Sequence, residues 1–189
     1  DQCRQNLARF ISLCPWNAIG ETGLDLRKGA PDLDFQINRF KDHIDLAREL
    51  HRPLIVHCVQ GHHHCLKTLK DDFKRSGPVK PGSPGVIHRA SCSVAEAQEY
   101  IKLDFYFSFG PDCLDPRRKK LKKLIKAIPL EKILLETDAP YSKTTVGELA
   151  GPWDLTKVVK EIARLKQLPG DTVSRTVFRN ALDLFGESA

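Results

Sequence analysis

Short apolar runs recur along the chain, and longer amphipathic stretches separate them. Short continuous apolar runs are typical of strands buried on both faces, whereas apolar positions three and four residues apart indicate helices that pack on a sheet. The fourth run alternates phenylalanines with Tyr106 and Ser108, as a strand does. We predict five strands, at residues 17–21, 53–57, 85–88, 103–109 and 132–136.

Amphipathic helices are predicted before, between and after these strands. In the stretch 34–51, apolar residues repeat at helical spacing and form a stripe wide enough to pack on a sheet. A turn at 23–25 is expected to open a polar loop that ends near residue 34. The other predicted helices cover residues 5–13, 61–74, 93–102, 116–126, 153–166 and 171–184.

This alternation of strands and helices predicts the fold class. It favours parallel strands with right-handed crossovers in an α/β, TIM-barrel-like (β/α) domain that spans residues 1–189. A closed barrel of this type has eight strand-helix units, and about five are present here. The chain also contains no methionine, even at position 1. We therefore expect N-terminal units of the barrel to be missing.

Four predicted strands end at or near a side chain that can bind a metal ion, namely Glu21, His57, His88 and Asp138. The carboxyl ends of parallel strands lie on one face, which is where a (β/α) barrel carries its active site. Imidazole and carboxylate ligands suit Zn, Mn or Mg. We predict one or two divalent metal ions and hydrolysis by a metal-activated water. Glu136 lies two residues before Asp138 and deeper, so a supporting role is expected for it.

A run of three histidines, 62–64, is a second candidate for metal binding. It is predicted to lie at the start of a helix, where adjacent side chains diverge and do not all reach one ion. We therefore expect a solvated cluster rather than a metal site.

Composition and charge narrow the choice of partner. The content of 41% hydrophobic and 29% charged residues is ordinary for a globular protein, and no apolar run is long enough for a membrane span. The net charge of +6 suits an anionic partner such as nucleic acid. Six cysteines without a C-x-x-C pair favour a reducing intracellular setting, cytoplasmic or nuclear. A monomer is the expected state.

Much of the positive charge lies in the predicted helix 116–126. We favour a solvated basic outer face for this helix over a dedicated nucleic-acid helix. Its first residues face the catalytic rim, so Arg117 and Arg118 are better placed for a phosphate than Lys123 or Lys126.

Several segments, in this order, resemble the motifs of the TatD family. These are 19–25 (IGETGLD), Gln36 with Phe40 and 46–47, 53–58 (PLIVHC), 86–88 (VIH), 134–141 (LLETDAPY) and 179–185 (RNALDLF). The resemblance covers nearly the whole chain. It implies an amidohydrolase-type barrel and a metal-dependent deoxyribonuclease.

The resemblance also implies roles for individual residues. Glu21 is expected to bridge two metals, His57 and His88 to complete one site, and Asp138 to belong to the other. Glu21 and Asp138 are the expected catalytic residues. Relatives supply a His-x-His pair from an N-terminal strand, and no such pair precedes Glu21 here. Apart from the resemblance, the expected substrate contacts are Asp25, Arg89, which stands where relatives have another motif, and Arg117 and Arg118 near the catalytic rim.

Three functions follow from these residues. The preferred one is an exonuclease-type deoxyribonuclease that cleaves DNA phosphodiester bonds. The same metal chemistry also permits an amidohydrolase-type enzyme acting on an ester or amide. The third is a chain that keeps the fold motifs but has impaired or no catalysis, because the upstream ligands are absent.

Overall fold

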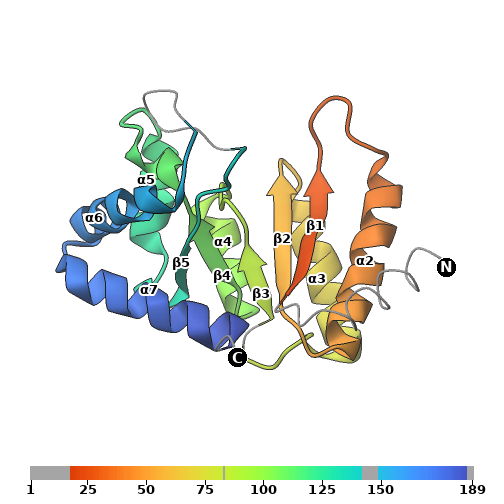
Figure 1. The fold of residues 1–189 in the computed structure, drawn as a ribbon. Helices are drawn as coiled ribbons and strands as arrows, with labels where there is room; N and C mark the ends of the chain where they lie inside the picture. The colour runs from red at the N-terminus through yellow and green to blue at the C-terminus, as the bar shows by residue number, and fades with distance from the viewer. Residues whose placement is uncertain (1–17, 83, 142–148, 187–189) are drawn as a thin grey trace.

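The computed structural model describes residues 18–82, 84–141 and 149–186. In this part of the chain, five parallel strands form one sheet whose spatial order is the chain order (Figure 1). The α/β prediction with a parallel sheet is therefore confirmed. The strands are β1 (Ile19–Asp25), β2 (Leu54–Val59), β3 (Gly85–Ile87), β4 (Tyr106–Phe109) and β5 (Ile133–Leu135).

Helices connect successive strands and follow the last one. They are α2 (Leu33–Glu49), α3 (His62–Ser76), α4 (Val94–Lys102), α5 (Lys119–Ala127), α6 (Leu155–Lys166) and α7 (Gly170–Phe185), with short 3-10 turns at Pro111–Leu114, Leu130–Lys132 and Pro152–Asp154. In Figure 1, α2 and α3 accompany β1 and β2, while α7 runs along the lower end of the sheet. The predicted helix at 5–13 lies outside the described residues.

Two of the element boundaries that differ from the sequence-based prediction lie near the predicted site. The first strand continues to Asp25, where a turn was expected, because Leu24 is fully buried in the core and residues 22–25 keep pairing with β2. The basic helix begins at Lys119 rather than at residue 116. The residues before it form a turn in which the Asp115 carboxylate accepts a hydrogen bond from the backbone N–H of Arg117.

β3 and β4 are buried on both faces, as their apolar runs predict, whereas β2 alternates buried and half-buried positions. On one face, Phe105 and Phe107 pack with Tyr100 of α4 in the main core. On the other face, Tyr106 belongs to a smaller cluster that includes Leu184 of α7. The alternation along β4 thus divides its side chains between two cores, and the polar residue Ser108 remains near the carboxyl end.

The loop between β3 and α4 is fixed by a capping box at the start of α4. The Ser93 hydroxyl accepts from the backbone N–H of Glu96, and the Glu96 carboxylate accepts from the backbone N–H of Ser93. This loop carries Arg89, so the capping box limits where that side chain can lie.

Among the described helices, none combines the length and the apolar character that a bilayer crossing requires.

Candidate metal centre

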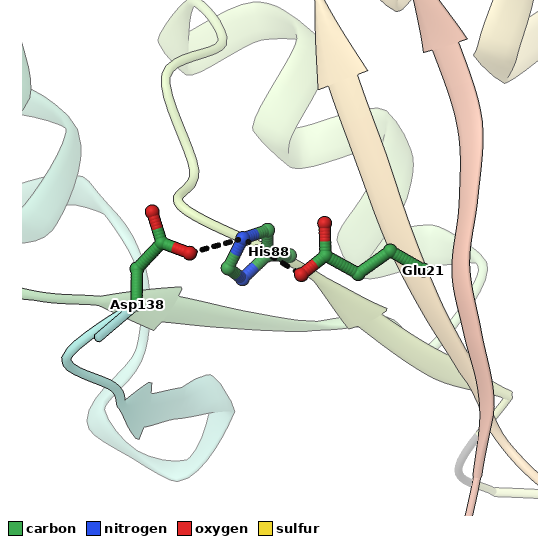
Figure 2. A group of neighbouring side chains, drawn as sticks. All are labelled: Glu21, His88 and Asp138. Atoms are coloured by element: carbon green, nitrogen blue, oxygen red, sulfur yellow. Dashed lines mark ion pairs between the residues drawn. The ribbon is translucent and has the colours of Figure 1, made fainter. Parts of the chain in front are cut away.

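Three side chains from distant parts of the chain meet at the carboxyl ends of the strands. Glu21 comes from β1, His88 follows β3 and Asp138 follows β5. Figure 2 shows the two carboxylates approaching the His88 ring from opposite sides. The His88 Nε2 atom lies 3.5 Å from Glu21 Oε1 and 3.6 Å from Asp138 Oδ1. The strand topology therefore brings together three of the four predicted metal ligands.

The position of Glu21 depends on the local geometry of β1. The pairing register with β2 shifts between Gly20 and Thr22, as in a β-bulge, which re-aims side chains near active sites. Gly23 has φ +139°, and a Cβ there would lie 2.1 Å from the carbonyl oxygen of His57. Only glycine fits this position. It allows β1 to approach β2 closely at the level of the predicted ligands.

The ring of His88 is oriented by Glu136. The His88 Nδ1 atom lies 2.7 Å from Glu136 Oε2, which also accepts a hydrogen bond from the Ser108 hydroxyl. A carboxylate accepts hydrogen bonds, so Nδ1 carries the hydrogen and Nε2 presents its lone pair toward Glu21 and Asp138. This carboxylate–histidine arrangement is typical of metal-binding histidines.

The charges around His88 favour a cation at this place. Burial by itself would lower the pKa of His88, but the hydrogen bond to Glu136 and the charges of Glu136, Glu21 and Asp138 outweigh it and raise the pKa. Three carboxylates around one imidazole thus attract positive charge. Within the described residues, Glu136 Oε1 is buried and has no hydrogen-bond partner.

Asp138 is held in place by Arg89. The Arg89 Nη1 atom lies 2.6 Å from Asp138 Oδ2, so the other oxygen, Oδ1, faces His88. Both residues have positive φ angles, 43° for Arg89 and 54° for Asp138, which non-glycine residues rarely adopt outside functional or tightly constrained sites. Arg89 therefore lies beside the ligand cluster as an anchor of one ligand.

His57 lies next to this cluster but outside it. Its Nδ1 atom is 3.7 Å from Glu21 Oε2, and its Nε2 atom is 3.2 Å from Asp25 Oδ2. The two oxygens of Glu21 thus face different histidines. Asp25 also forms an ion pair with Arg27, and this hydrogen-bonded pair keeps the pKa of Asp25 well below its usual value. The Asp25 carboxylate is therefore engaged with His57 and Arg27.

The group formed by Glu21, His88 and Asp138 fits a divalent metal ion. One ligand atom from each of the three residues lies within 4.8 Å of the other two. Ligand atoms that are each about 2.1 Å from one ion lie roughly 3 to 3.5 Å apart, so small side-chain movements would complete the coordination. Imidazole with carboxylate oxygens suits Zn, Mn or Mg.

A basic cleft of about 840 Å³ adjoins the cluster and is lined by both Glu136 and Asp138. Arg118 lines it and contacts Asp112 at 3.2 Å, and Arg89 contacts the same carboxylate at 3.0 Å. Arg117 also lines the cleft, although it pairs with Asp115. The structure therefore brings Arg89, Arg117 and Arg118 to one cavity beside the ligand cluster.

The histidine run at the start of α3 differs in part from the expected solvated cluster. His63 is exposed, but His62 is only 7% exposed and packs edge-to-face on Tyr100, with 3.2 Å between His62 Nδ1 and the Tyr100 hydroxyl. The expectation of solvation was wrong for His62 because the first turn of α3 packs against α4. Among the described residues, the only grouping of three metal-binding side chains is the one at Glu21.

Sequence reasoning missed several residues around the cluster. Ser108 holds Glu136, and Asp112 joins Arg89 to Arg118. Lys119 and Lys120 line the same cleft as Arg118, and so does Lys123, which was expected to be placed less favourably than the two arginines. The alternation along β4 places Ser108 on the same face of the sheet as Tyr106, and this alternation is the sequence signal from which Ser108 could have been found. Nothing in the spacing of Asp112 distinguishes it from an ordinary loop aspartate.

Comparisons with known proteins agree with this geometry. Residues 1–186 match the family model described as TatD related DNase. The chain is 32% identical over 170 residues to YabD of Bacillus subtilis, named an uncharacterized metal-dependent hydrolase, covering 89% of this chain and 64% of YabD. It is 37% identical over 125 residues to the 3'-5' ssDNA/RNA exonuclease TatD of Klebsiella pneumoniae, covering 66% of this chain and 45% of that protein. This chain thus spans less than two thirds of the length of each of these two relatives.

Solved structures give the same assignment. The crystal structure of YjjV, a TatD homologue from Escherichia coli, superposes with a TM-score of 0.86 at 26% identity, covering 98% of this chain and 70% of YjjV. A TatD-family hydrolase from Entamoeba histolytica shares the fold with a TM-score of 0.77 at 18% identity, covering 95% of this chain and 68% of that one. The predicted barrel-like fold is confirmed. The chain belongs to the TatD related DNase family.

Proposed function

We propose that this protein is a metal-dependent hydrolase that cleaves phosphodiester bonds in DNA as an exonuclease. The observation that carries the proposal is the orientation of His88, whose Nδ1 is held by Glu136 while Nε2 faces Glu21 and Asp138. Support also comes from relatives that are named metal-dependent hydrolases or nucleases. Mg, Mn or Zn are the proposed metals, because oxygen and imidazole ligands accept each of them.

The proposed roles follow from the contacts of each side chain. Glu21, His88 and Asp138 hold one cation, and His57 beside Glu21 Oε2 is placed to help hold a second. A bound divalent cation supplies Lewis-acid activation of water and of the phosphoryl group. Glu136 fixes the tautomer of His88, and Arg89 fixes the direction of the Asp138 carboxylate. Glu21 and Asp138 are the proposed catalytic residues.

The substrate phosphate is proposed to meet cationic side chains on the cleft side of the cluster. Arg118 lines the cleft and is exposed, and Arg117 is more exposed still, with 88% of its side chain accessible to solvent. Arg89 contributes charge through its position between Asp138 and Asp112. Asp25 is negatively charged and engaged with His57, so we propose that it orients His57 and does not itself meet the phosphate.

Hydrolysis of an uncharged ester or amide is the second candidate. A separate cavity of about 560 Å³ adjoins Glu21 and His88, and apolar side chains such as Ile55, Val86 and Phe178 form much of its wall. Apolar walls with a few polar groups are typical of sites for small organic ligands. This cavity favours an uncharged substrate, whereas the basic cleft favours a phosphodiester.

The deciding experiment measures metal content and cleavage together. Purified protein is analysed for bound Mg, Mn and Zn, and is then incubated with single-stranded DNA labelled at either end, with and without EDTA. Stepwise shortening from one end that requires the metal is the expected result. His63→Ala provides a matched control, because His63 is an exposed histidine outside the cluster.

Other outcomes separate the alternatives. Cleavage of p-nitrophenyl esters or amides but not of DNA would favour the second candidate. A protein that binds metal weakly and cleaves nothing would show that this chain keeps the family fold without competent catalysis.

We propose an intracellular location and a monomeric state as well. The four described cysteines, Cys58, Cys65, Cys92 and Cys113, are buried free thiols, which supports a reducing compartment. Sedimentation of the purified protein tests the monomeric state.

A further inference from the structure

The basic cleft is bounded by four segments that the fold brings together. These are the loop from β3 to α4, the end of β4, the start of α5 and the segment after β5. Its volume of about 840 Å³ lies within the range of cavities that enclose small ligands. One end is formed by Asp138 of the ligand cluster and by Glu136, which orients His88, and the other by the first turns of α5. A molecule bound at the cluster can therefore extend directly into the cleft.

Positive charge is in excess along the cleft. Six cationic side chains line it, against three carboxylates. Asp112 and Asp138 are already paired with Arg89 and Arg118, and Glu136 with His88. Across residues 18–82, 84–141 and 149–186, no ion pair involves the remaining lysines of the lining, which are Lys119, Lys120 and Lys123.

These lysines are unfavourable for α5 itself. Lys119 and Lys120 occupy the first turn, which contains no acidic residue, and positive charge there opposes the helix dipole. Lys122, one residue before Lys123, instead pairs with Glu161 at 2.7 Å. The helix thus neutralises the lysine that faces α6 and leaves the cleft lysines without carboxylates. Such a departure from local preference is expected where a ligand supplies the missing charge.

We propose that this cleft binds the backbone phosphates of the nucleotides next to the cleaved bond in a single nucleic-acid strand, with Lys119, Lys120 and Lys123 as the main contacts. The inference rests on the proposed function, because it assumes that a phosphodiester is cleaved at the adjoining cluster. The size of the cleft suits a few nucleotides of one strand rather than a duplex.

The lining also predicts how the strand is recognised. Phe109 is the one aromatic residue among the described residues that line the cleft, and it is 1% exposed. Stacking of bases on aromatic side chains, which is common in single-strand binding, therefore has no platform here. Contacts to phosphates carry no sequence information. Binding is accordingly independent of base sequence and strongly dependent on salt.

The test measures binding without cleavage, so it does not depend on catalysis. Fluorescence anisotropy in EDTA follows a labelled mixed-sequence 12-nucleotide DNA strand bound to wild-type protein, to Lys119→Gln/Lys120→Gln/Lys123→Gln and to a control, Lys41→Gln/Lys67→Gln/Lys74→Gln. The control changes the net charge equally at exposed lysines of α2 and α3. Melting curves establish that each variant is folded.

The cleft variant is expected to bind the strand at least tenfold more weakly than wild type, and its slope of log affinity against log salt is expected to fall by about 2, since each lost phosphate contact removes about 0.7. The control is expected to remain within twofold to threefold. Equal weakening in both variants would overturn the inference, because it would reflect net charge alone. If the wild type binds the strand in EDTA but cleaves no DNA in a separate assay with Mg, Mn or Zn added, the proposed function fails and the cleft assignment stands.

Discussion

The ligand cluster and the basic cleft lie side by side, yet they are built in opposite ways. In the cluster, Glu21 lies within β1, and the other two side chains follow β3 and β5, where Glu136 fixes His88 and Arg89 fixes Asp138. In the cleft, the charges come largely from one helix, and Lys119, Lys120 and Lys123 form no ion pair within the described structure. One region is acidic and preorganised, and the other is basic and adaptable.

This difference separates two tasks. Chemistry at a reacting phosphate requires groups held within a fraction of an ångström, which strand ends and hydrogen-bonded carboxylates provide. Retention of a variable strand requires charge without fixed geometry, which exposed lysines provide. Arg89 belongs to both regions, because it contacts Asp138 of the cluster and Asp112 of the cleft.

The largest effect on activity is expected from a substitution in the ligand cluster. We expect Glu21→Gln to reduce the rate of DNA hydrolysis by about 10³-fold or more, because it removes the charge that faces both histidines and would contact the metal. Initial rates on end-labelled single-stranded DNA measure the effect, and circular dichroism checks the fold. A residual rate within tenfold of wild type would show that this residue is not a metal ligand.

A smaller effect is expected when Glu136, which orients the ligand His88, is substituted. Glu136→Gln keeps the shape of the side chain but removes the charge that orients His88, so metal affinity is expected to fall by about 10 to 100-fold. Isothermal titration with Mn²⁺ measures this directly. Ser108→Ala, which removes only the hydroxyl that donates to the same carboxylate oxygen, serves as a milder comparison. Unchanged Mn²⁺ affinity in the Glu136 variant would show that the cluster does not depend on preorganisation.

The paired lysine of α5 allows a test of stability. The hydrogen bond from Arg164, together with the contact to Lys122, outweighs burial and lowers the pKa of Glu161 from its usual 4.5 to about 2. The stabilisation is therefore present above about pH 4.5 and is lost as the pH falls toward 2. We expect Glu161→Gln to cost about 1 to 2 kcal/mol at pH 7, a figure reduced for solvent screening. Urea denaturation at pH 7 and pH 3 checks that the difference shrinks in acid.

The smallest effect is expected from Arg117→Ala. Its side chain is 88% exposed and its ion pair with Asp115 is local, so the free energy of unfolding is expected to change by less than about 0.5 kcal/mol. Affinity for single-stranded DNA is expected to fall by about twofold to threefold at low salt, because one distant charge is removed. Anisotropy at two salt concentrations measures this. A tenfold loss of DNA affinity would show that this arginine, rather than the lysines of α5, makes the main phosphate contact.

The sequence predicted the strands well because their signal is local. All five apolar runs became parallel strands within a few residues of their expected limits, because a strand packed between helices takes mostly apolar residues. The end of β1 was misjudged because Gly23 resembles a turn residue, whereas here it permits close approach to His57. The two uses of glycine have the same sequence signature.

The sequence predicted those site residues that lie at or near the carboxyl ends of the strands. Glu21, His88 and Asp138 could be expected to converge because parallel strands share one carboxyl face. A supporting role could also be expected for Glu136, but the contact of Arg89 with Asp138 could not, because it depends on left-handed backbone angles at both residues. The same holds for the lysines of α5, whose direction depends on a helix start three residues later than expected.

The chain-order sheet also has a consequence for how the protein is made. Each described strand pairs only with the strands immediately before and after it in sequence, so no pairing waits for a distant segment. Each pairing waits only for the one helix between two strands, as between Ile19 and Leu54. Each strand-helix unit can dock onto the units already formed as the polypeptide leaves the ribosome, and the acidic cluster is complete only when Asp138, which follows β5, arrives beside Glu21 and His88.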